Sequence, residues 1–294
     1  MYRKKTRITA LDLVLMALIL AVLSYIGYRL TVKLNYKWNW PAIPRYLLYY
    51  SSEHHAWMSG ILLEGLYTTI RLSVWATLIA ALLGLVTGIM RATGGLFSRM
   101  MARTYVELIR NVPPLVLVFI FYFFFSAQIM PLLGVEDFIR SRSPAAQRWL
   151  AVFFATPDVF SAFLSGTITV AVFQGAYITE IVRAGIQSIE RGQWEAAYAL
   201  GLSWPRQMWD VVLPQALRRI LPALANEFIN TIKYSAIVSI ISIQELTFQG
   251  MQIMASTQMT IEVWLVVTAM YLVLCLVLSV GVQWLEQRLA RSDA

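Results

Sequence analysis

Long apolar runs, rather than a short alternation of apolar and polar positions, dominate the pattern along this chain. They cover residues 10–30, 66–90, 112–130, 159–182, 221–243 and 263–285. As a helix rising about 1.5 Å per residue, each run is long enough to cross a hydrocarbon core of about 30 Å. The pattern therefore predicts an all-α fold, a polytopic membrane helix bundle of about six transmembrane helices.

The fourth run is less apolar than its neighbours. Its polar side chains are Ser161, Ser165, Thr167, Thr169, Gln174 and Thr179. Small and hydroxyl-bearing residues of this kind occur where membrane helices pack on one another. We expect the fourth helix to face other helices rather than lipid. Gly84 and Gly88, four residues apart in the second run, predict close helix packing there.

The fifth run contains two charged residues, Glu227 and Lys233. Charge at membrane depth is costly and usually faces a cavity or a partner. A spacing of six residues does not favour an ion pair within one helix. Either these side chains meet water, substrate or another helix, or they are structural contacts within the bundle, and the sequence leaves both readings open.

Composition supports the membrane class. Hydrophobic residues make up 59% of the chain and charged residues 14%, whereas soluble domains have about 25% charged residues. The net charge of +8 is spread over loops between the predicted spans. It forms no continuous basic face with interleaved aromatic residues, so it favours anionic lipid over nucleic acid as a partner.

The distribution of Lys and Arg predicts the orientation, because short cytoplasmic loops carry an excess of positive charge. With the N-terminus inside, the larger, cytoplasmic group contains Arg3, Lys4, Lys5, Arg7, Arg91, Arg99, Arg103, Arg183, Arg191, Arg206, Arg218, Arg219, Arg288 and Arg291. The smaller, outer group contains Arg29, Lys33, Lys37, Arg45, Arg140, Arg142 and Arg148. We therefore predict a multi-pass membrane protein with both termini in the cytoplasm. The first run is too long for a signal peptide and is interpreted as a retained anchor.

Enzymatic motifs are missing from the sequence. It contains no G-x-x-x-x-G-K-[ST] phosphate loop and no G-x-S-x-G elbow. Cys275 is the one cysteine, and His54 and His55 are adjacent without further ligands nearby. We expect no catalytic residue, no metal site and no cofactor bound by this chain.

The segment 190–214, ERGQWEAAYALGLSWPRQMWDVVLP, is too long and too polar for a turn. Good helix formers fill residues 193–200, and Gly201 suits the left-handed residue that ends a helix. Ser203 is a candidate cap for a following helix, with Pro205 in its first turn. The pattern predicts two short helices outside the membrane with a sharp bend between them.

This segment also has the features of a docking surface. Trp194 and Tyr198 lie four residues apart and can anchor in a partner's groove. The small side chains of Ala196, Ala197 and Ala199 allow close approach. The alternative is an amphipathic hairpin at the membrane interface with no protein partner.

Glu195-Ala196-Ala197, then Gly201, then Val211-x-Leu213-Pro214 resembles, spacing included, the EAA loop of bacterial ATP-binding-cassette (ABC) importer permeases. In that family the loop forms a coupling helix that sits in a cleft of the ATPase subunit. The resemblance assigns this role to Glu195, Ala196, Ala197 and Gly201. Trp194, Tyr198 and Pro214 complete the predicted coupling residues.

Four further segments are similar to the polar-amino-acid branch of those permeases: residues 62–73, 105–116, 175–197 and 213–240. The resemblance implies a type I ABC-importer permease domain over residues 61–286, with its coupling helix near residues 190–202. Residues 1–60 would be an N-terminal tail, an additional transmembrane helix and an outer loop. Residues 287–294 would be a cytoplasmic tail.

The resemblance implies uptake of a polar amino acid by alternating access. The implied partners are a cytoplasmic ATPase that binds ATP and Mg, a second permease subunit (identical or homologous), an extracytoplasmic amino-acid-binding protein and membrane lipid. The predicted substrate path comprises Gln174, Glu227, Lys233 and Tyr234.

Tyr234 bears on the choice of substrate. Related permeases often have an acidic residue just after the lysine that corresponds to Lys233, whereas this chain has Tyr234. The departure disfavours a cationic substrate and favours an acidic or amide side chain, as in glutamate, aspartate or glutamine.

Two functions of other classes stay open on the sequence alone. A secondary transporter driven by an ion gradient would use Glu227 or Glu180 as its coupling group, although no internal repeat is evident. A membrane scaffold would use the docking segment without a transport path.

Overall fold

The computed structural model describes residues 10–32, 36–53 and 55–291, and the chain divides into two units, Met1–Trp40 and Pro41–Ala294. Several predictions fall outside the described residues: those for Arg3, Lys4, Lys5, Arg7, Lys33 and His54, and the end of the predicted C-terminal tail. The first unit contains helix α1 (Ala10–Val32), which matches the first apolar run.

The second unit begins with short elements. A 3₁₀ turn (Trp40–Ala42) begins at the last residue of the first unit, and helix α2 (Pro44–Leu47) then leads into strands β1 (Leu48–Ser51) and β2 (Ala56–Ser59). The strands pair antiparallel, with Leu48 opposite Ser59 and Ser51 opposite Ala56. This hairpin is an addition to the predicted all-α fold. Its aromatic residues favour strands, and the rings of Tyr50 and Trp57 pack edge to face with centroids 5.8 Å apart.

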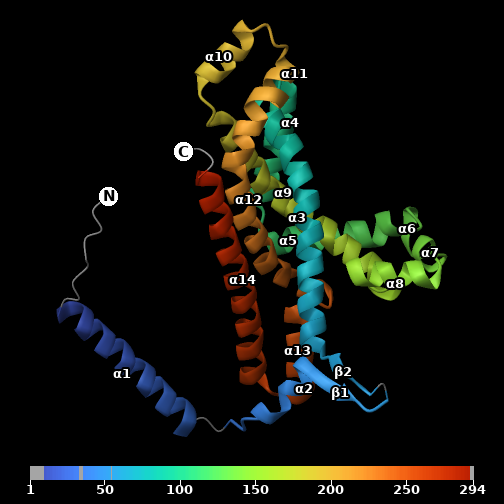
Figure 1. Ribbon diagram of the computed structural model, residues 1–294. Helices are drawn as coiled ribbons and strands as arrows, with labels where there is room; N and C mark the ends of the chain where they lie inside the picture. The colour runs from blue at the N-terminus through green and yellow to red at the C-terminus, as the bar shows by residue number, and fades with distance from the viewer. Residues whose placement is uncertain (1–9, 33–35, 54, 292–294) are drawn as a thin grey trace. The chain divides into compact units, whose positions relative to one another are not determined.

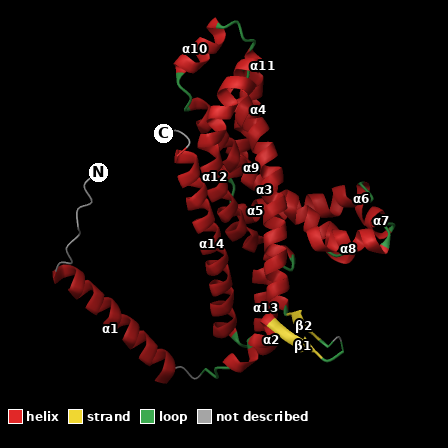
Figure 2. Cartoon of the chain, viewed as in Figure 1, coloured by secondary structure: helices red, strands yellow, loops and turns green. Residues whose placement is uncertain are grey.

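Helices make up the rest of this unit (Figures 1 and 2). In chain order they are α3 (Ile61–Thr93), α4 (Leu96–Asn111), α5 (Pro114–Phe124), a π-helical segment (Phe125–Ile129), α6 (Met130–Leu132), α7 (Val135–Arg140), α8 (Pro144–Phe153), a 3₁₀ turn (Pro157–Val159) and α9 (Phe160–Gln187). They continue as α10 (Arg191–Ala199), α11 (Trp204–Arg206), a π-helical segment (Gln207–Val212), α12 (Leu213–Ser235), a 3₁₀ turn (Ala236–Ile241), α13 (Leu246–Thr257) and α14 (Thr260–Arg291).

The arrangement of the second unit separates its two ends. Figure 1 shows α10 at one end and the β hairpin, α2 and α13 at the other, with α3 running between them. Helices α6, α7 and α8 project to one side between these ends, in a region where the sequence predicts only an outer loop. Pro113 and Pro114 lie at the start of α5 and separate that helix from α4. Proline is tolerated in the first turn of a helix but cannot continue the helix before it.

Helices α3 and α9 form the centre of the bundle. The predicted close packing at Gly84 and Gly88 is confirmed, because a Cβ atom on Gly88 would lie 2.6 Å from Val182 Cβ and 3.0 Å from the Thr179 carbonyl oxygen. Ile178 and Val182 belong to the main buried cluster, which includes residues of α3, α9 and α12. Glycine at these positions lets the two backbones approach closely.

Five helices of the described chain are long and apolar enough to cross a membrane: Ala10–Arg29, Ile61–Thr93, Pro114–Leu132, Pro157–Gln187 and Thr260–Arg288. The predicted fifth span, residues 221–243, is not among them. Its residues form the second part of α12 and a 3₁₀ turn, and α12 carries polar side chains such as Asn226, Glu227 and Asn230. The run was read as one apolar span because hydropathy does not distinguish an amphipathic helix with a buried polar face.

Candidate functional site: coupling segment and substrate path

Helix α10 ends as the sequence predicts. Gly201 has a φ angle of +75°, in the left-handed region that favours glycine. The Leu202 amide donates to the Ala197 carbonyl over 3.2 Å, and the Gly201 amide donates to the Tyr198 carbonyl over 2.9 Å. This pair of hydrogen bonds is a Schellman motif, which satisfies carbonyls at the end of the helix and turns the chain sharply.

The side chains of α10 divide between two faces. Ala197 is buried, and Trp194 is partly buried against the main core of its own chain. Glu195, Ala196 and Ala199 are exposed, and Tyr198 is 77% exposed. The surface open to a partner therefore centres on Glu195 and Tyr198, while Trp194 holds α10 to the bundle.

The second short helix of the prediction is not separate. Helix α11, the π-helical segment and α12 follow one another without a break from Trp204 to Ser235, with Pro214 in the first turn of α12. Ser203 precedes α11 but its side chain makes no capping hydrogen bond. Gln215 Nε2 donates to Gln193 Oε1 over 3.2 Å, which ties α12 to α10.

Glu227 and Gln174 meet at the contact between α12 and α9. Gln174 Nε2 donates to Glu227 Oε1 over 3.0 Å and to Thr231 Oγ1 over 2.8 Å. Asn230 Nδ2 donates to the other carboxylate oxygen over 3.1 Å. Glu227 is 8% exposed and Gln174 is fully buried. The structure thus brings together two of the four predicted path residues, on facing helices.

One atom of this cluster has no partner. Gln174 Oε1 is buried and accepts no hydrogen bond from the described residues. A buried acceptor without a donor is costly, and such groups occur at functional sites. The Gln174 oxygen and the adjacent carboxylate form an acceptor-rich spot that suits an ammonium or amide donor.

Lys233 and Tyr234 make no hydrogen bond to Gln174 or Glu227 in the described part of the chain. Lys233 is exposed and takes part in none of the ion pairs among the described residues. Lys233 thus forms no ion pair with Glu227 among the described residues. Tyr234 is half exposed and packs edge to face on Phe173 of α9, with ring centroids 5.5 Å apart.

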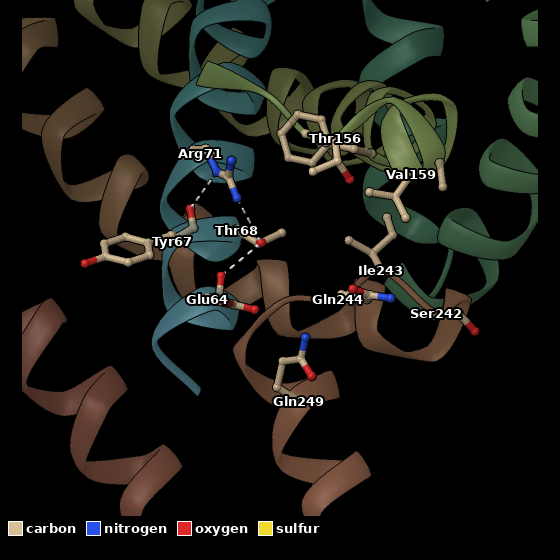
Figure 3. A pocket seen from close by; sticks show the side chains of 13 residues that line it. Glu64, Tyr67, Thr68, Arg71, Thr156, Val159, Ser242, Ile243, Gln244 and Gln249 are labelled. Atoms are coloured by element: carbon tan, nitrogen blue, oxygen red, sulfur yellow. Dashed lines mark hydrogen bonds between the residues drawn. The ribbon is translucent and has the colours of Figure 1, made fainter. Parts of the chain in front are cut away.

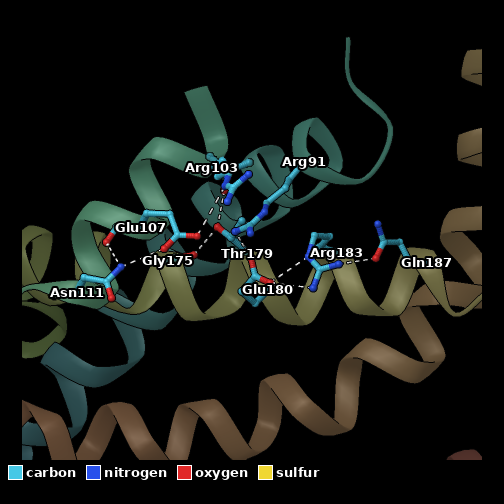
Figure 4. Close-up of polar contacts among 10 residues, drawn as sticks. Arg91, Arg103, Glu107, Asn111, Gly175, Thr179, Glu180, Arg183 and Gln187 are labelled. Atoms are coloured by element: carbon cyan, nitrogen blue, oxygen red, sulfur yellow. Dashed lines mark hydrogen bonds and ion pairs between the residues drawn. The ribbon is translucent and has the colours of Figure 1, made fainter. Parts of the chain in front are cut away.

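A second polar cluster joins α3 to α9 on the α10 side (Figure 4). Arg91 forms an ion pair with Glu180, and Arg183 Nε donates to the other Glu180 oxygen over 3.0 Å. Nearby, Thr87 Oγ1 and Thr179 Oγ1 share a hydrogen bond of 2.6 Å. Glu180, the other candidate coupling group of a gradient-driven transporter, is occupied in holding α9 to α3.

Comparison with known proteins decides the family. The family model described as "Binding-protein-dependent transport system inner membrane component" matches residues 76–291, which is most of the chain. This chain belongs to that family. Its multi-pass architecture and the EAA loop at Glu195 to Gly201 fit this membership, and permeases of the family are transport components rather than enzymes.

Relatives within the family indicate the branch to which the chain belongs. The permease is 33% identical over 230 residues to "Probable glutamine ABC transporter permease protein GlnM" of Bacillus subtilis (strain 168), covering 78% of this chain and 94% of the relative. It is 32% identical over 263 residues to "Glutamine transport system permease protein GlnP" of Escherichia coli (strain K12), covering 87% of this chain and 99% of the relative. It is a polar amino-acid ABC permease.

Solved structures agree on the fold. The crystal structure of an amino acid ABC transporter with histidines matches with a TM-score of 0.61 and 33% identity, over 78% of this chain and 94% of the other. The MetNI methionine ABC transporter, in an inward-facing conformation, matches with a TM-score of 0.59 at 16% identity, over 78% of this chain and 96% of the other. At this identity, the second match supports the fold alone.

Sequence reasoning missed one polar centre of the permease, Glu245. Its side chain caps α13 by accepting from the Phe248 amide over 2.8 Å. Tyr271 of α14 donates to the same carboxylate over 2.7 Å, and Thr69 of α3 approaches it at 3.4 Å. The sequence signal was an acidic residue just beyond an apolar run, but its partners come from helices distant in sequence.

Proposed function

We propose that this permease is the membrane subunit of an ATP-driven importer that carries polar amino acids with an amide side chain, L-glutamine above all, across the bacterial inner membrane. The observation that carries the proposal is the buried Gln174 and Glu227 pair with its unpartnered Gln174 oxygen. A substrate ammonium or amide would donate to these acceptors.

The surroundings favour an amide over a charged side chain. The residue after Lys233 is Tyr234 rather than a carboxylate, which weighs against a cationic substrate. A substrate carboxylate placed next to Glu227 would be repelled by like charge. The naming of glutamine in the relatives from Bacillus subtilis and Escherichia coli supports the same choice.

The partners follow from the exposed surface of α10. Glu195, Ala196 and Tyr198 would dock in a cleft of a cytoplasmic ATPase, which binds ATP and Mg. We expect both termini in the cytoplasm, as the distribution of Lys and Arg predicts. A second permease subunit would complete the path, and an extracytoplasmic binding protein would deliver the amino acid. ATP binding would shift the permease population toward the outward-open state.

Co-purification tests the coupling role. Tagged wild-type permease, extracted from native membranes in mild detergent, should recover a Walker-motif ATPase. Glu195→Arg and Gly201→Val should lose it, because the first reverses a charge in the docking surface and the second strains a left-handed turn. Glu136→Arg, on an exposed position of α7, is the matched control and should retain the ATPase. Failure to recover any ATPase with wild type, even after gentle cross-linking, would contradict the proposal.

Uptake tests the path itself. With the partners reconstituted in vesicles, Glu227→Gln should lower ATP-dependent L-glutamine uptake by roughly tenfold or more, the order expected when a charge-assisted hydrogen bond of about 1.5–3 kcal/mol is lost. The Glu227→Gln variant should still recover the ATPase in the co-purification. Uptake by the permease alone under a proton or sodium gradient would instead support a secondary transporter, and unchanged uptake in Glu227→Gln would remove Glu227 from the path.

A further inference from the structure

A cavity with both charged and apolar side chains in its wall lies apart from the Glu227 cluster (Figure 3). Its volume is about 320 Å³, and its walls come from the start of α3, residues 155–163, and residues 242–249 before and within α13. None of Gln174, Glu227, Thr231 and Lys233 lines it. Its size falls at the lower end of the range of about 300–1,000 Å³ for small-molecule sites.

Arg71 supplies a positive charge to this cavity. The side chain is partly buried and donates only to neutral oxygens: the Ala151 carbonyl, the Tyr67 carbonyl at 3.3 Å and Thr68 Oγ1 at 3.3 Å. No ion pair among the described residues includes Arg71. A desolvated guanidinium without a carboxylate partner is suited to bind an anionic group of a ligand.

Glu64 supplies the opposite charge. It lies seven residues before Arg71 on α3, which places the two on the same side of the helix about 10 Å apart along its axis. Figure 3 shows Glu64, Thr68 and Arg71 in succession along one helix. Glu64 Oε1 accepts a hydrogen bond from Ser59 Oγ at 3.3 Å and forms no ion pair among the described residues. The cavity thus has a cation and an anion along one wall.

Gln249 of α13 adds a side-chain amide to the cavity wall. It is 6% exposed, lines the cavity, and its side chain makes no hydrogen bond with the residues that the structure describes. In Figure 3 its amide group points toward the cavity from α13. Its amide offers two donors and an acceptor that are open to the cavity, where a polar ligand can pair with them.

We propose that this cavity is a second binding site for a free, zwitterionic polar amino acid, with the α-carboxylate on Arg71, the α-ammonium toward Glu64 and the polar side chain on Gln249. The inference rests on the proposed function in that amino acids are the substrates. It adds a site that the amino acid occupies separately from Glu227.

Protection of a cysteine tests the site. In a Cys275→Ala background, Thr156→Cys puts a thiol at an exposed position of the cavity wall. The assembled transporter in nanodiscs is labelled with a maleimide with and without L-glutamine. L-Glutamine at about ten times its dissociation constant should slow labelling about tenfold, because the rate scales with the unoccupied fraction. L-Glutamine methyl ester, which lacks the carboxylate, should not protect.

Variants assign the protection to this cavity. Arg71→Gln, Glu64→Gln and Gln249→Met should each abolish it, whereas Arg148→Gln, on α8 and away from the cavity wall, should retain it. Protection should also survive Glu227→Gln. Loss in Glu227→Gln together with persistence in Arg71→Gln would assign the effect to the main path and overturn the proposal, as would absence of protection in the parent.

A second measurement needs no cysteine. Radiolabelled L-glutamine should still bind to the purified Glu227→Gln transporter and should be lost when Arg71→Gln is added. Uptake measured in parallel separates the two proposals. If ATP-driven glutamine uptake is intact but neither cysteine protection nor glutamine binding to Glu227→Gln is seen, this site alone is overturned. If the wild type takes up no amino acid, the proposed function is overturned.

Discussion

Helices α9 and α14 are both long enough to cross the membrane, yet they occupy opposite environments. The stretch of α9 that qualifies as a span is the least apolar of the five in the described chain, and 67% of it is buried inside the protein. The corresponding stretch of α14 is the most apolar, and 6% of it is buried. In a lipid solvent, strong apolarity marks the surface, and polar or small residues mark the centre.

The contacts of the two helices explain the difference. Helix α9 packs on α3 through Gly84 and Gly88, on α12 through Gln174, and on α4, where Tyr105 donates to the Val172 carbonyl over 2.6 Å. Helix α14 exposes a row of aliphatic side chains: Leu272, Val273, Leu276, Val277 and Val280. The comparison predicts that equal substitutions have unequal consequences in the two helices.

Replacing a glycine gives the largest expected difference. Gly88→Val would press on Val182 and on the Thr179 carbonyl of α9, so that the two helices must separate. The cost should exceed the about 1–3 kcal/mol of a local overpacking, because contacts along both helices are lost. Size-exclusion chromatography of the tagged protein in detergent should give no monodisperse peak. Gly281→Val in α14, where an added Cβ meets nothing within 4 Å, should behave as wild type. Equal behaviour of the two variants would break the comparison.

Shortening an aliphatic side chain should give the next largest effect. Ile178 of α9 is fully buried, so Ile178→Ala leaves a cavity and should destabilise the protein by about 2–5 kcal/mol. Val277 of α14 is 65% exposed, and Val277→Ala should change stability by less than about 0.5 kcal/mol. Thermal unfolding of both variants in the same detergent measures the contrast. A large loss in Val277→Ala would mean that α14 is covered in the assembled state.

Removing the carboxylate of an ion pair should have the smallest effect on stability. Glu180→Gln removes the carboxylate between Arg91 and Arg183, whose side chains are at most about one-third exposed. The cost should be about 1–3 kcal/mol, between that of an exposed and a fully buried pair. Glu107→Gln, which breaks the exposed pair with Arg103, should cost less than about 1 kcal/mol. High salt should lower the stability of wild type toward that of Glu180→Gln only slightly; a strong salt dependence would show that the α3–α9 pair is solvated.

The sequence correctly predicted features that depend on residues close together along the chain. The end of α10 at Gly201 follows from the conformational freedom of glycine and from the need to satisfy terminal carbonyls, both of which are local. The burial of α9 follows from its own polar residues. The sequence placed Gln174 and Glu227 on the same predicted substrate path but did not predict their hydrogen bond. That contact depends on how α9 and α12 are aligned, which is a property of the packed bundle.

Long-range packing accounts for what the sequence did not predict. The cavity at Arg71 combines three segments separated by many residues, and Glu245 finds its partners on α3 and α14. Counting apolar residues without their position on the helix predicts an ordinary span for the second part of α12. Helices α6 to α8 were interpreted as a loop because each is short.

The unbroken run from Trp204 to Ser235 has a mechanical consequence. Trp204 and Glu227 are separated by roughly 35 Å along a helix that rises 1.5 Å per residue, with a π-helical segment and Pro222, which removes one helix hydrogen bond, between them. If this run moves as a stiff rod, a tilt of about 5° near α10 displaces Glu227 by about 3 Å at that length. This displacement equals the length of the hydrogen bond from Gln174 to Glu227. A small tilt at the α10 end of this run would then suffice to make or break that contact.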